Sequence, residues 1–143
     1  MIGMIITGHG NFATGIESAL TLIGGKPSNF YAIDFVEGDS TEVLSEHLKK
    51  ALDSLKACKG VIICADLAGG SPFQVSVTMT SKMKNIEVLG GVNLPLCMEL
   101  NIMRQVETDV TLLAESMVNT GKEQILRFEL VEKLEKQDFS EGI

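Results

Sequence analysis

The residue best suited to chemistry in this chain is His9, which lies between Gly8 and Gly10 directly after an apolar run. An imidazole can take up and release a proton, or carry a covalently bound group, near neutral pH. The flanking glycines remove the bulk that would otherwise cover the ring. A motif is a hypothesis until its structural context agrees, so a loop histidine without a role is the alternative interpretation.

Two further features carry groups that suit a nucleophilic histidine. Asp66 follows a continuous apolar segment, and its carboxylate can hold one imidazole nitrogen and thereby direct the other. A turn at Gly69, Gly70 and Ser71 precedes an expected helix, and the backbone N–H groups there can bind a phosphoryl dianion. The Ser71 hydroxyl can also bind that dianion, or Ser71 can act as a plain N-cap.

These residues are positioned by segments that alternate between strand and helix character. The helical segments carry an apolar stripe, and the strand at 60–65 is apolar throughout, which indicates burial on both faces. Such alternation predicts a doubly wound α/β fold with a mainly parallel sheet. Strands are expected at 2–7, 30–35, 60–65 and 86–90, and helices at 12–23, from 40, from 71, from 93 and from 108 or 109 to near 121.

The expected strand order is 2-1-3-4, within a single domain covering 1–143. Ligands of such sheets bind beyond the carboxyl ends of the strands, where the strand order reverses. That place lies between the first and third strands, which His9 and Asp66 follow. Residues 126–130 alternate apolar and charged side chains, so they can form a further strand or extend the last helix.

The amino-acid composition and net charge argue against several classes of function. The chain has 143 residues, 45% of them hydrophobic and 22% charged, as in an ordinary globular domain. A net charge of −7 argues against nucleic acid or an anionic membrane as partner and allows a basic protein. We expect no signal peptide and no membrane span. Three cysteines without close pairing indicate reduced thiols in the cytoplasm, each acting as a small buried residue: Cys58, Cys64 and Cys97.

Positive charge is scarce around the candidate site. No lysine or arginine precedes Lys26, and none lies between Lys59 and Lys82. A phosphoryl group on His9 would rest on amides and hydroxyls, unless the fold brings Arg104 near. We therefore infer that a partner protein supplies the cation during transfer, as arginines supplied in trans do elsewhere.

No cofactor is expected, and a metal site is not indicated. Neither histidine has another ligand at metal-binding spacing, and His47 lies at the boundary of the second helix. Four methionines can line a partner groove, although core packing is the more typical role: Met79, Met83, Met98 and Met103.

Two other functions fit parts of the same pattern. Gly8, Gly10 and Ala13, with Asp34 ending the next strand, match a dinucleotide-binding fingerprint, but one short domain leaves little room for a second nucleotide-binding half. A serine hydrolase would use Ser71, yet the proline that follows removes an amide that oxyanion holes often use. A third alternative is a purely structural dimer module, and the clustering of the site residues is the one feature that argues against it.

Four segments, in this order and spacing, resemble the mannose-type IIA components of the bacterial phosphoenolpyruvate-dependent sugar phosphotransferase system. The likeness covers nearly the whole chain and is greatest to the stand-alone IIA proteins of galactosamine and N-acetylgalactosamine uptake, including the ending at 141–143. Leu67 and Ala68 depart from the mannose branch, so mannose specificity is not implied. The four segments are 6–10 (Ile-Thr-Gly-His-Gly), 32–35 (Ala-Ile-Asp-Phe), 66–73 (Asp-Leu-Ala-Gly-Gly-Ser-Pro-Phe) and 90–95 (Gly-Gly-Val-Asn-Leu-Pro).

The resemblance implies specific roles. His9 would accept a phosphoryl group from the phosphocarrier HPr on Nε2 and pass it to a separate IIB protein, with membrane IIC and IID components acting later. Asp66 would orient His9, and Ser71 would lie in the turn beside it. The family fold is a homodimer that exchanges a last antiparallel strand, which favours a strand at 126–130. A related phosphocarrier of dihydroxyacetone phosphorylation is the nearest alternative.

Overall fold

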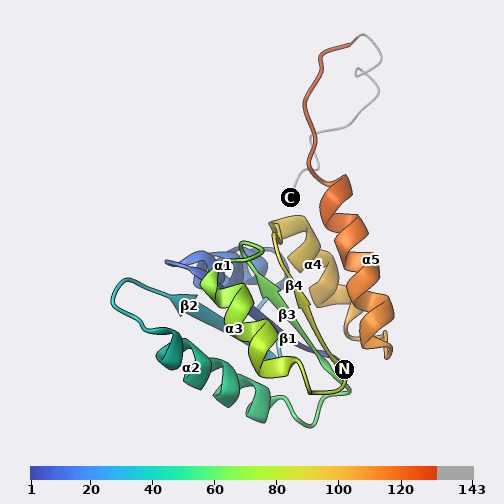
Figure 1. Ribbon diagram of the computed structural model, residues 1–143. Helices are drawn as coiled ribbons and strands as arrows, with labels where there is room; N and C mark the ends of the chain where they lie inside the picture. Colours follow the sequence, from blue (N-terminus) through green and yellow to red (C-terminus); the bar gives the residue numbers. More distant parts are fainter. Residues whose placement is uncertain (132–143) are drawn as a thin grey trace.

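The computed structural model describes residues 1–131 of the chain. Four parallel strands form one sheet in the order β2-β1-β3-β4 (Figure 1), which confirms the expected topology. The central strand β1 pairs with β2 on one side and with β3 on the other, so that Thr7 lies between Ile33 and Ala65. The strands are β1 (Gly3–His9), β2 (Phe30–Phe35), β3 (Val61–Ala65) and β4 (Ile86–Leu89).

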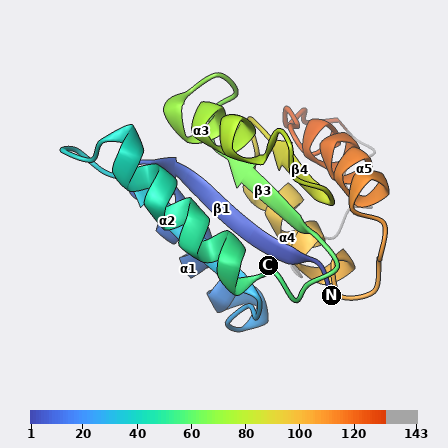
Figure 2. The same ribbon diagram turned by 60° about the horizontal axis from the view of Figure 1, so that its bottom comes forward.

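Helices cover both faces of the sheet (Figure 2). Helices α1, α4 and α5 pack on one face, and α2 and α3 pack on the other. None of the helices within residues 1–131 combines the length and apolar character that a bilayer crossing requires. The helices are α1 (Phe12–Gly24), α2 (Thr41–Ser54), α3 (Ser71–Thr80), α4 (Leu94–Met103) and α5 (Val110–Glu123).

The two cores follow from the alternation of side chains along the central strands. Ile5 and Ile63 belong to the core beneath α2 and α3, whereas Ile6 and Cys64 belong to the core beneath α1, α4 and α5. Strands buried on both faces read as continuous apolar runs, which explains the sequence of β3. The thiol hydrogen bond to Cys97, together with burial, raises the pKa of Cys64.

Helix α3 begins differently from the expectation. Its N-cap is Gly70, in an extended conformation, and Ser71 is the first helical residue rather than the cap. The Gly70 carbonyl accepts the Gln74 N–H at 2.9 Å, which closes the first turn without a serine side chain. By contrast, α2, α4 and α5 have side-chain caps, in which Ser40, Asn93 and Asp109 accept the backbone N–H of Val43, Leu96 and Leu112.

The segment that follows α5 leaves the sheet layers (Figure 1). Residues 125–131 form neither a helix nor a strand in the single chain. Their apolar side chains are largely exposed, with Leu126 at 82%, Phe128 at 67% and Leu130 at 83%. The strand expected at 126–130 is therefore absent from the isolated chain, and its pairing with a second copy stays a prediction. The ending at 141–143 lies outside the described residues.

Arg104 lies at the amino edge of the sheet, so the idea that it approaches His9 is wrong. Helix α4 starts near the carboxyl edge and ends at the opposite one, which carries Arg104 away from the candidate site. The side chain is 1% exposed, and within residues 1–131 no carboxylate lies within ion-pair distance of it. Its guanidinium donates instead to the carbonyls of Ile2, Ser28 and Asn29 and to Oδ1 of Asn101.

Arg104 thus joins the start of β1, the loop before β2 and the end of α4 by hydrogen bonds alone. We expect Arg104→Ala to lower the free energy of unfolding by about 3 kcal/mol, because it leaves the buried carbonyl of Ile2 and the part-buried carbonyls of Ser28 and Asn29 without this donor. Chemical denaturation measures this loss. Arg127→Ala, at a side chain that is 83% exposed, serves as the control and should change stability little. Equal effects of the two variants would contradict this role of Arg104.

Candidate functional site

His9 and Asp66 come together at the carboxyl edge of the sheet. His9 is the last residue of β1, and Asp66 directly follows the adjacent strand β3. One carboxylate oxygen, Oδ2 of Asp66, accepts both the backbone N–H of His9 at 2.9 Å and a hydrogen bond with ring Nδ1 at 2.9 Å. The same oxygen therefore fixes the main chain and the side chain of His9.

This arrangement leaves one ring nitrogen available. A carboxylate can only accept hydrogen bonds, so a neutral His9 must carry its proton on Nδ1 and its lone pair on Nε2. Nε2 makes no hydrogen bond to any residue in 1–131. The His9 side chain is 47% exposed, whereas that of Asp66 is 13% exposed. The nucleophilic nitrogen thus faces an open surface, and the orienting carboxylate lies behind it.

The charge of Asp66 depends on its contacts with His9. Burial by itself raises the pKa of the Asp66 carboxyl group, but the His9 backbone N–H, the His9 ring and the Leu67 amide outweigh it and hold this pKa below its usual value. The second carboxylate oxygen, Oδ1, is buried and has no hydrogen bond of ordinary geometry within residues 1–131. Asp66 is therefore a carboxylate near neutral pH, with its interactions concentrated on His9.

Phe35, at the end of β2, packs against the imidazole ring. Phe35 meets it edge to face, with ring centroids 5.9 Å apart at 73°. The Gly10 N–H donates to the Phe35 carbonyl at 2.8 Å, which links the residue after His9 to the end of β2. Gly10 has a φ of +56°, in the left-handed region that favours glycine. The contact between His9 and Phe35 could not be predicted from the sequence, because it arises from the register of β1 with β2.

Two glycines allow the close approach of the site residues. A Cβ on Gly8 would lie 2.9 Å from Cγ of Asp66, and a Cβ on Gly70 would lie 2.9 Å from Cε1 of His9. Any larger residue would push the carboxylate or the ring aside. Within the expected turn at Gly69, Gly70 and Ser71, Gly70 thus lies beside the imidazole. The Ser71 hydroxyl makes no hydrogen bond within residues 1–131.

Positive charge is absent from the strand-to-helix loops at this edge. None of the four segments that lead from a strand to the next helix, 10–12, 36–41, 66–71 and 90–94, contains a lysine or an arginine. The segment between β2 and α2 instead carries Glu37 and Asp39, and Glu42 follows in the first turn of α2. The four strand-to-helix loops beside His9 therefore carry acidic but no basic side chains.

Asp34 has a different role from the one that a dinucleotide fingerprint assigns. Its carboxylate accepts the Thr14 hydroxyl at 2.6 Å and the Thr14 backbone N–H at 3.0 Å. These contacts occupy the carboxylate and one of the free N–H groups in the first turn of α1. The acceptor that would bind a ribose hydroxyl is thus already engaged, which argues against the dinucleotide interpretation.

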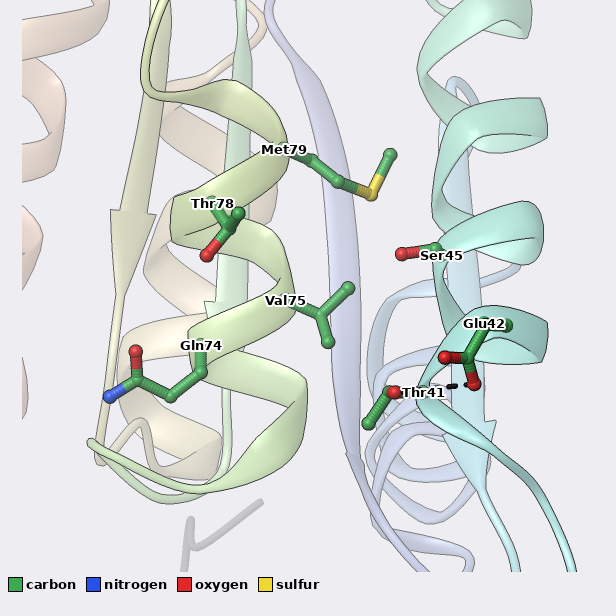
Figure 3. Close-up of a pocket in the computed structure, with 7 residues that line it drawn as sticks. All are labelled: Thr41, Glu42, Ser45, Gln74, Val75, Thr78 and Met79. Atoms are coloured by element: carbon green, nitrogen blue, oxygen red, sulfur yellow. Dashed lines mark hydrogen bonds between the residues drawn. The ribbon is translucent and has the colours of Figure 1, made fainter.

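A groove of about 270 Å³ lies between α2 and α3 (Figure 3). Both helices begin at the sheet edge that carries His9, so the groove runs away from the site along one face. Met79 and Val75 reach into it from α3, opposite Ser45 on α2 (Figure 3). Among the four methionines, Met79 and Met98 pack partly against the cores, whereas Met83 and Met103 are exposed. The core-packing expectation is therefore right for two of them.

Comparison with known proteins identifies the family. Residues 3–118 match the family model described as "PTS system fructose IIA component", where PTS denotes the phosphotransferase system. The fructose-specific EIIA component of Bacillus subtilis is 29% identical over 105 residues, which cover 73% of this chain and 72% of that protein. The mannose-specific EIIAB component of Escherichia coli K12 is 32% identical over 134 residues, covering 92% of this chain but 42% of that protein.

A solved structure shows the same similarity in three dimensions. The phosphotransferase system component EIIA from Streptococcus agalactiae superposes with a TM-score of 0.83 at 33% identity, covering 90% of this chain and 98% of that chain. A mannose/sorbose-specific IIA subunit from Enterococcus faecalis, at 21% identity and a TM-score of 0.82, shares the fold. The chain therefore belongs to the mannose-type IIA family of the phosphotransferase system, which includes fructose, mannose and sorbose components.

Proposed function

We propose that this protein is a phosphohistidine carrier, in which His9 accepts a phosphoryl group from phospho-HPr and passes it to a separate IIB protein. The observation that carries the proposal is the bond between Nδ1 of His9 and Asp66, which leaves Nε2 as the exposed nucleophile. Membership of the IIA family supports the transfer role. Aspartate and histidine lie where a doubly wound sheet places its reactive groups.

Each transfer exchanges one phosphorus–nitrogen bond for another. The Nε2 lone pair of His9 attacks the phosphorus atom, a bond to Nε2 forms, and the bond to the donor histidine breaks. The ring gains positive charge because Nδ1 keeps its proton while Nε2 becomes bonded to phosphorus. Asp66 accepts the Nδ1–H bond and offsets that charge, so it is an orienting residue that also stabilises the phosphorylated form. Transfer to IIB reverses these changes.

The phosphoryl oxygens need donors of hydrogen bonds. In the proposal, the backbone N–H groups of Gly69 and Ser71 supply them at the amino end of α3, with the Ser71 hydroxyl as a further donor. The expected contribution of Gly70 is not available from its amide, because the Gly70 N–H already donates to the Leu67 carbonyl at 3.1 Å. The four strand-to-helix loops at this edge contain no lysine or arginine, so the partner supplies the positive charge in the transition state. The acidic side chains of these loops suit a partner with a basic face.

We further propose that the protein acts as a homodimer in which each copy completes the sheet of the other. Strand β4 pairs with β3 alone within residues 1–131, so its outer edge is free. Residues 126–130 expose alternating apolar side chains, the pattern of a strand with one face to bury. This segment would add to β4 of the second copy as an antiparallel strand.

The remaining parts of the proposal rest on the resemblance to IIA proteins of amino-sugar uptake. The transported sugar would be galactosamine or N-acetylgalactosamine. IIB would pass the phosphoryl group to that sugar during uptake, so the membrane components IIC and IID would be indirect partners of this chain. The chain would act in the cytoplasm, peripheral to the transporter, as one domain over 1–143. If this assignment is right, deletion of the gene should impair growth on these amino sugars and leave growth on mannose unchanged.

Incubation with phosphoenolpyruvate, enzyme I and HPr should produce an acid-labile, base-stable phosphate on the protein. We expect His9→Ala to abolish labelling, and Asp66→Ala to slow it by about 10- to 100-fold while the label stays on His9. His47→Ala, which removes the other histidine at an exposed site, should label at the normal rate. When the donor is an HPr variant that lacks the lysines and arginines of its interface, the wild-type protein should be labelled slowly. Labelling of His9→Ala would contradict the proposal.

The lowered pKa of Asp66 predicts a pH-dependent contribution to stability. Its carboxylate stabilises the fold above the unfolded pKa of about 3.9, and this contribution is lost as pH falls through the lower folded pKa. The difference in unfolding free energy between the wild type and Asp66→Asn should therefore be larger at pH 5 than near pH 2.5, in urea titrations. Glu115→Gln, at an exposed site on α5, is the control. A pH-independent difference for Asp66→Asn would contradict the argument.

Sedimentation of the full chain should give the mass of two copies. Phe128→Asp with Leu130→Asp should halve that mass, because a charged face cannot be buried against the partner. Arg127→Ser with Glu129→Ser changes the alternate side chains of the same segment and should leave the dimer intact. A monomeric wild type, or a dimer that survives the two aspartates, would contradict strand exchange.

A further inference from the structure

Positively charged side chains cluster at the amino edge of the sheet, which is the edge opposite His9. Six of the ten lysines and arginines among residues 1–131 lie in two short segments, 49–59 and 82–84, which together contain one acidic residue, Asp53. The rest of residues 1–131 carries 14 aspartates and glutamates against four cations. The six are Lys49, Lys50, Lys56, Lys59, Lys82 and Lys84.

These two segments enclose a cavity of about 260 Å³ at the amino edge of the sheet. The connection from α2 to β3 forms one wall, and the connection from α3 to β4 forms the other; both lie near the N-terminus in Figure 1. Three exposed lysines and one exposed carboxylate, that of Asp53, line the cavity, together with apolar side chains that are mostly buried or half-buried. The lysines are Lys56, Lys59 and Lys84, and the apolar residues include Leu52, Val61 and Ile86.

The backbone around the cavity is fixed by specific contacts. The Asn85 carbonyl accepts the Val61 N–H at 3.0 Å, which ties the two walls together. Asn85 has a φ of +59°, a left-handed conformation that aspartate and asparagine adopt more readily than most residues. A Cβ on Gly60 would lie 2.5 Å from the Asn85 carbonyl oxygen, so only glycine allows this approach. The cavity is thus bounded by a defined backbone, and the lysines project from it.

We propose that this cavity binds a small organic dianion, such as a phosphate ester or a dicarboxylate. Lysine ammonium groups are flexible point charges that bind phosphate and carboxylate oxygens, and the apolar lining accommodates a short carbon skeleton. The volume is below that of pockets for drug-sized ligands, which limits the occupant to a small metabolite. Because the lysines lie at the amino edge, this site is separate from the phosphoryl site at His9.

Nuclear magnetic resonance of the full chain tests the proposal with 3-phosphoglycerate and succinate as anionic probes and glycerol as the neutral control. We expect saturable shifts of the backbone amides of Lys59, Gly60, Lys84 and Asn85 with at least one anion, and none with glycerol. Comparing the two anions separates a phosphate-ester site from a dicarboxylate site, and saturable binding of either supports the proposal. His9→Ala should bind the anion with unchanged affinity.

Charge variants distinguish binding in the cavity from nonspecific attraction of anions to the lysines of this edge. Lys59→Glu with Lys84→Glu should weaken binding by about tenfold or more. The matched pair Lys49→Glu with Lys50→Glu changes the net charge equally outside the cavity lining and should retain most of the affinity. The milder pair Lys59→Gln with Lys84→Gln covers the case in which the glutamates disturb folding. The proposal is overturned if neither anion saturates, if shifts occur only at Gly69 to Ser71, or if both glutamate pairs lose affinity equally.

Discussion

The site depends on one carboxylate oxygen that serves two parts of the same residue. Oδ2 of Asp66 accepts the His9 backbone N–H and the His9 ring Nδ1, both at 2.9 Å. The first bond fixes where the end of β1 lies relative to β3, and the second fixes the tautomer and direction of the ring. Loss of Asp66 would therefore disturb both the position of the main chain and the chemistry of Nε2. This is why the same aspartate bears on stability and on transfer in the proposed function.

The parallel sheet makes this contact possible, and glycine makes it close. Adjacent strands β1 and β3 deliver their last residues to one edge, where His9 and Asp66 meet. The absence of a side chain at Gly8 and Gly70 leaves room for the carboxylate and the ring. The four strand-to-helix loops then offer amides and acidic side chains but no lysine or arginine, which suits the proposed exchange of a phosphoryl group with a basic partner. The separation of charge between the two edges is consistent with distinct ligands at each.

Much of this arrangement could be predicted from the sequence because it depends on local patterns and one rule of topology. Apolar runs and caps located the strands and most helices, and the strand order placed His9 beside Asp66. Features set by three-dimensional packing were missed or misplaced. The cap of α3 is Gly70 rather than Ser71, because the glycine adopts the extended cap conformation. Arg104 binds carbonyls at the opposite edge, which no spacing in the sequence indicates.

Two other features could not be predicted from the sequence, because they also depend on which segments pack together. The lysine-lined cavity joins segments about 25 residues apart, at 52–61 and 83–86, and only the pairing of β3 with β4 brings them together. Residues 126–130 show the opposite case, since their alternating pattern is clear in the sequence while no strand within residues 1–131 pairs with them. A pattern predicts the kind of element, whereas the element that it pairs with is a property of the assembly.

The most direct test of the central claim is to determine which ring nitrogen of His9 carries the phosphoryl group. Nitrogen and phosphorus magnetic resonance of the protein, phosphorylated through HPr with labelled histidine, distinguishes the two positions. The geometry predicts phosphorus bonded to Nε2, with the Nδ1 proton retained in the hydrogen bond to Asp66. Phosphorylation at Nδ1, or at His47, would contradict the account.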